Sequence, residues 1–127
     1  MRSGLSCIHH FALTIPEFML THIVIWKYRS EVSQAEREAH AARLRALPGV
    51  IPEIVSFVVG FDVLRLPRSY DLGLVAVFRE RAGLDAYTDH PQHQEVAALG
   101  RELAEHVASV DFEDENRNDE RGTMSDE

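Results

Sequence analysis

The segment YTDHPQHQEV, residues 87–96, brings together side chains that can exchange protons near neutral pH. A histidine, with its pKa near 6.5, can take a proton from a carbon next to a carbonyl group. A tyrosine hydroxyl can hydrogen-bond the oxygen that then becomes negative. His90 and His93 are three residues apart, so they could also share one helix face as metal ligands. The pair His90-Pro91 is typical of a helix start. The segment is therefore compatible with an acid/base site, a metal site or a helix start.

The metal alternative has the least support. A zinc site needs about four ligands, and the segment has no clear cluster of carboxylates. His22 would be a third ligand only if its strand ran close to the helix end, and Cys7 is expected outside the folded domain. We therefore predict no bound metal.

The helix-start alternative has clear local signals. Asp89 or His90 would be the N-cap, with Pro91 in the first turn. His93 precedes Val96 by three positions, which places it on the inward stripe of that helix. It could simply donate a hydrogen bond to a backbone carbonyl, so the sequence leaves a structural role open for both histidines.

The apolar pattern predicts an alternation of strands and helices. Four strands are expected, at 20–29, 53–63, 70–79 and 108–113. Ser33 and Glu36 form a capping box that opens the first helix, and Pro48-Gly49 ends it. A short helix over 82–89 precedes a longer one from Pro91, whose buried stripe is Val96, Leu99, Leu103 and Val107. The order β-α-β-β-α-β predicts a ferredoxin-like α+β fold, a four-stranded antiparallel sheet with helices on one face.

Several predicted strands are apolar on both faces. In the first strand, His22 and Trp26 point one way, and Ile23 and Ile25 point the other. Helices cover one face only, and a soluble monomer rarely exposes an apolar patch of more than roughly several hundred Å². We therefore predict a homodimer that packs sheet to sheet through the open face.

Composition and charge narrow the classes of partner. The 127 residues, 45% of them apolar, suit one globular domain. The net charge is −8, and most of it lies between 113 and 127, where seven acidic residues and two arginines occur. The rest has no basic stripe, so nucleic acid is not an expected partner. No apolar run reaches the length of about 18 residues that a membrane span requires, so no membrane partner is expected.

The two ends of the chain are predicted to lie outside the domain. Residues 1–18 are interpreted as an N-terminal extension, 19–113 as the domain, and 114–127 as an acidic disordered tail. Two histidines and a proline interrupt the apolar stretch of the first 18 residues, so a signal peptide is not expected. The single cysteine, Cys7, excludes an intrachain disulfide. A cytoplasmic protein is the expectation.

Five segments, taken in order, resemble a known family. The resemblance is to the stress-responsive A/B barrel (Dabb) family, and it covers roughly residues 19–113. It implies a ferredoxin-like protomer and a dimer whose two sheets enclose a barrel-like interior. Many members have no established activity, a plant branch closes polyketide chains by aldol condensation, and some related dimeric folds are cofactor-free monooxygenases. The segments are HIVIWKYR (22–29), GVIPEI (49–54), RSYDLGLVAVF (68–78), AYTDHPQHQEV (86–96) and VDFE (110–113).

The resemblance also implies roles for particular residues. In the cyclase branch a tyrosine and a histidine act as an acid/base pair, and by position they match Tyr87 and His93. A histidine that recurs in the first strand of the family matches His22, which would help to orient a ligand. The cyclase branch has a further histidine early in the third strand, where this chain has Leu72. The cyclase activity itself is therefore not carried over.

These observations lead to three functional hypotheses. The first is a homodimeric Dabb-type protein whose specific activity is not evident. The second is a small cofactor-free enzyme of the polyketide cyclase or monooxygenase type, with Tyr87 and His93 as the catalytic acid/base pair. The third is a protein that binds an apolar small molecule without turnover. The predicted ligand-binding side chains are His22, Trp26, Phe57 and His90, and neither a cofactor nor a metal is predicted.

Overall fold

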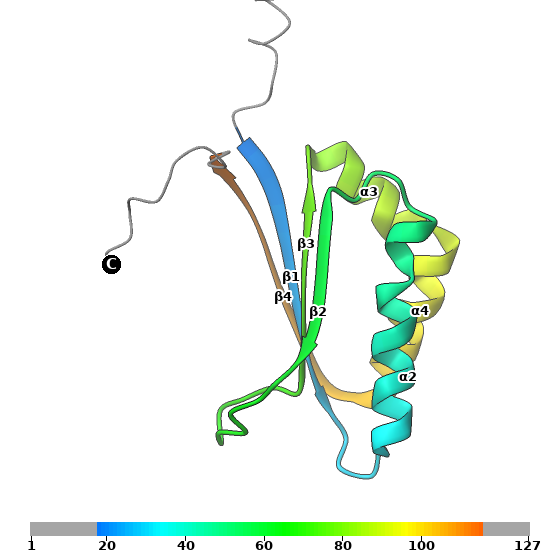
Figure 1. The fold of residues 1–127 in the computed structure, drawn as a ribbon, viewed down its shortest axis with the longest axis vertical. Helices are drawn as coiled ribbons and strands as arrows, with labels where there is room; N and C mark the ends of the chain where they lie inside the picture. The colour runs from blue at the N-terminus through cyan, green and yellow to red at the C-terminus, as the bar shows by residue number, and fades with distance from the viewer. Residues whose placement is uncertain (1–17, 116–127) are drawn as a thin grey trace, which may run out of the picture.

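The computed structural model describes residues 18–115, which form one antiparallel sheet and its helical cover (Figure 1). Strand β1 (Phe18–Tyr28) is followed by helix α2 (Gln34–Arg45) and a short 3-10 turn, η1 (Leu47–Gly49). The next elements are strands β2 (Ser56–Phe61) and β3 (Leu72–Phe78), helices α3 (Arg81–Asp89) and α4 (Pro91–Leu103), and strand β4 (Ala104–Glu115). Of the predicted extension, 1–18, and the predicted tail, 114–127, residues 1–17 and 116–127 lie outside the described residues, whereas Phe18 belongs to β1.

The strands lie in the order β2-β3-β1-β4, and every neighbouring pair is antiparallel. Helices α2, α3 and α4 all lie on the same side of this sheet (Figure 1). The predicted ferredoxin-like α+β fold is therefore confirmed. As predicted, the second helical segment is two helices, because the chain turns at His90, whose backbone is extended with φ −64° and ψ 133°.

Local signals place the helix ends. Ser33 Oγ accepts the Glu36 N–H at 3.1 Å, and the Glu36 carboxylate accepts the Ser33 N–H at 2.8 Å, which completes the predicted capping box. At α4, His90 Nδ1 accepts the Gln92 N–H at 3.1 Å, and Pro91 takes the first helical position. Of the two predicted N-caps for α4, His90 is therefore the correct one, because Asp89 still belongs to α3.

The core lies between the helices and one face of the sheet. Alternate residues of the two central strands point toward the helices, as the period of two requires, and most of them are buried. Helix α2 meets them with Ala41 and Leu44, and α4 with Val96 and Leu103. Burying a side chain of this kind contributes roughly 1.5–3 kcal/mol of stability. The buried residues of the central strands are Leu20, Trp26, Tyr28, Leu72, Leu74, Ala76 and Phe78.

Two predicted strand boundaries were wrong. The second strand was expected at 53–63, but β2 spans Ser56–Phe61, and the flanking Val55 and Val63 are 42% and 83% exposed. Residues 51–55 still belong to the turn that follows η1. Phe61 pairs with Leu72, the first residue of β3, so residues beyond Phe61 have no partner in that strand. The alternating apolar pattern in the sequence therefore continues beyond the residues that pair with the neighbouring strand.

The fourth strand is longer than predicted. It begins directly after α4 and pairs with β1 from Ala104 to Glu115, so it includes Asp114 and Glu115 of the predicted tail. Val107, which was assigned to the helical stripe, lies in this strand and is 45% exposed. The free edge of β1 offers pairing partners along its whole length, and this tertiary pairing overrides the helical spacing of Leu103 and Val107.

The open face of the sheet carries a row of apolar residues across all four strands. Val58 pairs with Val75, Val75 with Ile23, and Ile23 with Val110, so the four side chains lie on the same face. Val58 and Val110 are 65% and 53% exposed. The sheet therefore has apolar residues on both faces, as the sequence predicted.

A buried histidine joins α2 to the sheet. His40 is fully buried, and its Nδ1 lies 2.7 Å from the Tyr28 hydroxyl. Its Nε2 has no hydrogen-bond partner among the described residues, and the Trp26 ring lies edge-on at 5.2 Å between centroids. Gly100 of α4 permits this close approach, because a Cβ there would lie 2.8 Å from Trp26 Nε1. Burial, with a smaller effect of the Arg43 charge, lowers the pKa of His40 to about 4.

We expect this histidine to make the fold acid-sensitive. The pKa of His40 is lower in the folded chain than in the unfolded chain, so the unfolded state binds more protons below the unfolded pKa. The free energy of unfolding is therefore highest above about pH 6.5, and it falls by up to about 3 kcal/mol as the pH drops to 4. Urea unfolding across this range, on the wild type and on His40→Gln, measures the effect. The variant should show a flatter pH dependence, whereas the exposed His106→Gln should match the wild type, and equal slopes for all three proteins would contradict the prediction.

Candidate functional site

Tyr87 is the centre of an aromatic cluster between the helices and the sheet. It lies near the end of α3, and only 1% of its surface is exposed. Four rings surround it, from α4 and from three strands. Their centroids lie 4.2 Å (His93), 5.2 Å (Phe78), 5.8 Å (His22) and 6.1 Å (Phe57) from that of Tyr87.

The turn at His90 brings Tyr87 and His93 together. The His90 N–H donates to the Tyr87 carbonyl at 3.2 Å, which ends α3 and lets α4 start in a new direction. Two side chains that are six residues apart on one straight helix would point to different sides. Here the two rings lie against each other, with their planes tilted by 43°. The proline and the histidine cap therefore position the two predicted acid/base residues side by side.

His93 is held in a defined protonation state. Its Nδ1 lies 3.2 Å from the Thr88 carbonyl oxygen, which can only accept, so Nδ1–H is the donor and Nε2 carries the lone pair. Burial lowers the pKa of His93 below its usual value, the hydrogen bond to Thr88 raises it in part, and the nearby charges of His22, Arg101 and His90 lower it further. At neutral pH this side chain is a neutral base.

His22 is paired with a carboxylate from the neighbouring strand. Residues 22 and 111 are directly opposite each other in the β1–β4 ladder, and His22 Nδ1 hydrogen-bonds the Asp111 carboxylate. Because an ionised carboxylate only accepts, Nδ1–H is the donor here too. The sequence reasoning missed Asp111. Parity places Asp111 on one face with Val107 and Ser109, but Glu113 shares that face, and only the strand register sets Asp111 opposite His22.

The Tyr87 hydroxyl remains protonated at every physiological pH. Burial raises the pKa of Tyr87 well above its ordinary value. A protonated phenol in a pocket of rings is a hydrogen-bond donor that can stabilise a developing oxyanion. The cluster therefore combines a neutral base, a donor and a histidine–carboxylate pair.

A cavity of about 520 Å³ lies beside this cluster. Two of its lining residues are the partners of the histidines, because Asp111 bonds His22 and Thr88 provides the carbonyl for His93. Its volume is within the range of small-molecule sites, roughly 300–1,000 Å³. The lining is mixed in character, and it consists of Leu20, Arg81, Leu84, Asp85, Thr88, Asp111, Phe112 and Glu113.

The predicted ligand-binding residues do not all lie together. His22 and Phe57 are in the Tyr87 cluster. Trp26 packs against the buried His40 instead, since it is four residues along β1 from His22, a separation of roughly 13 Å. The side chain of His90 caps α4.

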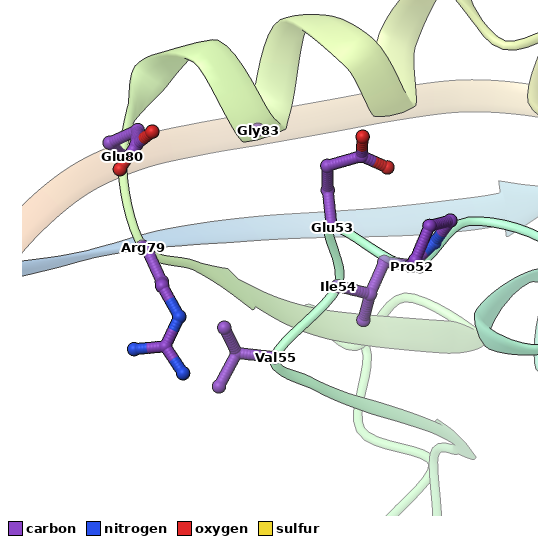
Figure 2. A pocket seen from close by; sticks show the side chains of 7 residues that line it. All are labelled: Pro52, Glu53, Ile54, Val55, Arg79, Glu80 and Gly83. Atoms are coloured by element: carbon purple, nitrogen blue, oxygen red, sulfur yellow. The ribbon is translucent and has the colours of Figure 1, made fainter.

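A second cavity, of about 360 Å³, lies where the chain passes from β3 to α3 (Figure 2). In Figure 2, Glu53 points toward α3 near Gly83, and the Arg79 side chain extends toward Val55. Its charged residues, Glu53, Arg79 and Glu80, are all exposed. None of its lining residues is hydrogen-bonded to a histidine of the Tyr87 cluster, whereas Asp111 and Thr88 of the first cavity are.

Residues 18–115 hold no group of three or more metal-ligating side chains. In the same part of the chain, no helix combines the length and the hydrophobicity needed to cross a membrane.

Comparisons with known proteins agree with the fold. A protein of Streptomyces coelicolor without a characterised function is 30% identical over 97 residues, which cover 75% of this chain and 99% of that protein. A dimeric ferredoxin-like protein of unknown function from Thermobifida fusca is 27% identical, with a TM-score of 0.70 over 79% of this chain and 94% of that one. The hydroxynitrile lyase of Passiflora edulis has a TM-score of 0.72 over 80% of this chain and 97% of the lyase. It is 20% identical, so the likeness concerns the fold alone.

The sequence pattern of the Stress Responsive A/B Barrel Domain (Dabb) family matches residues 20–114, which include all four strands and the three helices around Tyr87. This agrees with the resemblance found in the sequence. The chain belongs to the stress-responsive A/B barrel domain family.

Proposed function

We propose that the protein is a cofactor-free acid/base enzyme that transfers a proton next to a carbonyl group of a small molecule. One observation carries the proposal: the buried Tyr87 is enclosed by two histidines, and each histidine is oriented through its Nδ1 by an acceptor of its own. The similar proteins of Streptomyces coelicolor and Thermobifida fusca have no characterised function, so the site chemistry must support the proposal.

The proposed reaction assigns one step to each group. His93 Nε2 takes the proton from the carbon, and the bond pair moves onto the carbonyl oxygen. The Tyr87 O–H hydrogen-bonds that oxygen as it becomes negative. The protonated His93 then returns the proton to the product, and His22, held by Asp111, orients the substrate.

The cavity beside the cluster supports a substrate that is partly apolar. Leu20 and Leu84 provide apolar side chains, whereas Asp85, Asp111 and Glu113 carry carboxylates. Asp111 is paired with His22 and Asp85 with Arg81, so the lining offers polar groups that a purely apolar molecule would not use. A small ketone or aldehyde with an apolar substituent suits the lining better.

We also propose that the protein is a homodimer in which a second copy covers the open sheet face. The row formed by Val58, Val75, Ile23 and Val110 supports this, because it is a contiguous apolar strip on an otherwise uncovered sheet. The structurally similar protein of Thermobifida fusca is described as dimeric. Sheet-to-sheet packing would bury the strip in both copies.

We propose the cytoplasm as the compartment in which the protein acts. The chain has a single cysteine, Cys7, so it cannot form the intrachain disulfides that are common in exported proteins. A free thiol is compatible with the reducing cytoplasm.

Exchange of α-protons tests the enzyme proposal without knowledge of the natural substrate. The wild type, incubated in D₂O with a panel of small ketones and aldehydes, should accelerate deuterium incorporation as followed by proton NMR. His93→Ala should lose about a hundredfold of this acceleration, because it removes the base. Added imidazole should restore part of it. Tyr87→Phe should lose about tenfold or more, because it removes one donor to the oxyanion.

The exposed His106→Ala is the matched control and should keep the wild-type rate. Melting temperatures of all variants separate catalysis from stability. If no panel member exchanges faster than in buffer, and His93→Ala also loses about 1–3 kcal/mol of unfolding free energy, the histidine has a structural role and the proposal is wrong.

The protonation state of His93 is a separate prediction. Nitrogen-15 NMR should show a neutral ring with the proton on Nδ1 at pH 7, because the Thr88 carbonyl accepts there. Its pKa should lie below 6.5, so any activity that depends on it rises with pH through that pKa and is level at neutral pH. A ring protonated on Nε2 alone, or a pKa above 6.5, would contradict the assignment of His93 as the base.

The dimer has its own test. Val58→Lys places a charge on the open face at a position that is 65% exposed in the single chain, so the fold should tolerate it. Light scattering should give twice the monomer mass for the wild type and a shift toward the monomer for the variant. Val50→Lys, at an exposed position beside η1, should stay dimeric, and a monomeric wild type at micromolar concentration would rule out the dimer.

A further inference from the structure

The loop between β2 and β3, residues 62–71, borders the open face of the sheet. Figure 1 shows it leaving the lower end of the sheet and projecting to the side away from the helices. Lys27, which points to the open face, donates from Nζ to the Ser69 carbonyl at 3.3 Å. A cavity of about 380 Å³ lies between the loop and the sheet. It is lined by Arg68 and Tyr70 of the loop and by Ile25, Gly60 and Gly73 of the open face.

Hydrogen bonds hold this loop in one shape. The buried Asp71 accepts the Tyr28 N–H at 2.8 Å and the Arg65 guanidinium at 3.0 Å. The Asp62 carboxylate accepts the Arg65 N–H at 2.7 Å. Arg65 has a φ of 55°, in the left-handed region that is unfavourable for a side chain of this size. Such a conformation persists only where the surrounding contacts enforce it.

The ordered loop exposes two consecutive apolar side chains. Val63 is 83% exposed and Leu64 is 69% exposed, the highest values among the large exposed apolar residues of the described chain. A flexible loop could turn such side chains away from water at a small cost in free energy. A tip held by Asp62, Arg65 and Asp71 keeps them in water, which is unfavourable unless another surface covers them.

We propose that Val63 and Leu64 pack against the second copy of this chain, so that residues 62–71 form a clasp at the rim of the dimer. The inference rests on the proposed dimer and specifies a contact outside the sheet faces. A copy that lies flat on the open face must meet a loop that projects from that same side. The two-fold symmetry of a dimer then repeats the contact, and each copy contributes its own loop.

The contact has a measurable consequence for dimer affinity. Leu64→Asp should weaken the dimer at least about a hundredfold, since one apolar contact is lost in each copy and a charge is added. Sedimentation velocity from nanomolar to high micromolar concentration measures the dissociation constant of the full-length protein. The melting temperature of the monomeric variant should equal that of Val58→Lys, because Leu64 makes no contribution to the core of the single chain.

The control variant and a second readout separate the outcomes. Val50→Asp, also at an exposed apolar position but beside η1, should keep the wild-type dissociation constant. Hydrogen exchange at amides 62–70 should slow when the wild type is concentrated from monomer to dimer. A wild type that never dimerises would overturn the dimer itself. A dimeric wild type with an unchanged dissociation constant in Leu64→Asp, and unchanged exchange in the loop, would overturn the clasp alone.

Discussion

Strand β1 pairs on both of its edges, with β3 and with β4, and the rest of the structure depends on this central position. Because side chains alternate along a strand, the pairing divides β1 into two functional sides. His22, Trp26 and Tyr28 face the helices, and Ile23 and Ile25 face away. The same ladder sets Asp111 opposite His22 and extends the apolar row of the open face to Val110. One strand therefore contributes to the core, to the candidate site and to the proposed dimer.

Two histidines that lie between the helices and the sheet have different roles. His40 is fully buried, and its contacts are with Tyr28 and Trp26. Its depressed pKa is a property of the fold and links stability to pH. His93 is only partly buried and lies against Tyr87 beside a cavity. Burial lowers the pKa of both, but only the His93 side chain is partly exposed.

The proposed enzyme and the proposed dimer use opposite faces of the sheet. The proposed proton-transfer cluster lies between the sheet and the helices, whereas the loop 62–71, which contains the exposed Val63 and Leu64, projects to the side away from the helices. A substitution on one face should therefore leave the other largely unaffected, since residues far apart with no shared partner act nearly additively. This separation makes the two proposals testable one at a time.

Local signals in the sequence determined the fold class and most of the elements. The capping box of Ser33 and Glu36, the start of α4 at Pro91 and the alternation of β1 act over a few residues, so they can be identified without tertiary structure. Tyr87, His93, His22 and Phe57 were likewise identified from residue type, position and family resemblance. The tertiary structure alone decided which of these residues meet. It placed Trp26 away from the cluster, added Asp111 and extended β4 through Val107. The physical reason is that contacts between β1, β4 and α4 join residues roughly 90 positions apart, and no periodicity within one segment encodes the register of such a pairing.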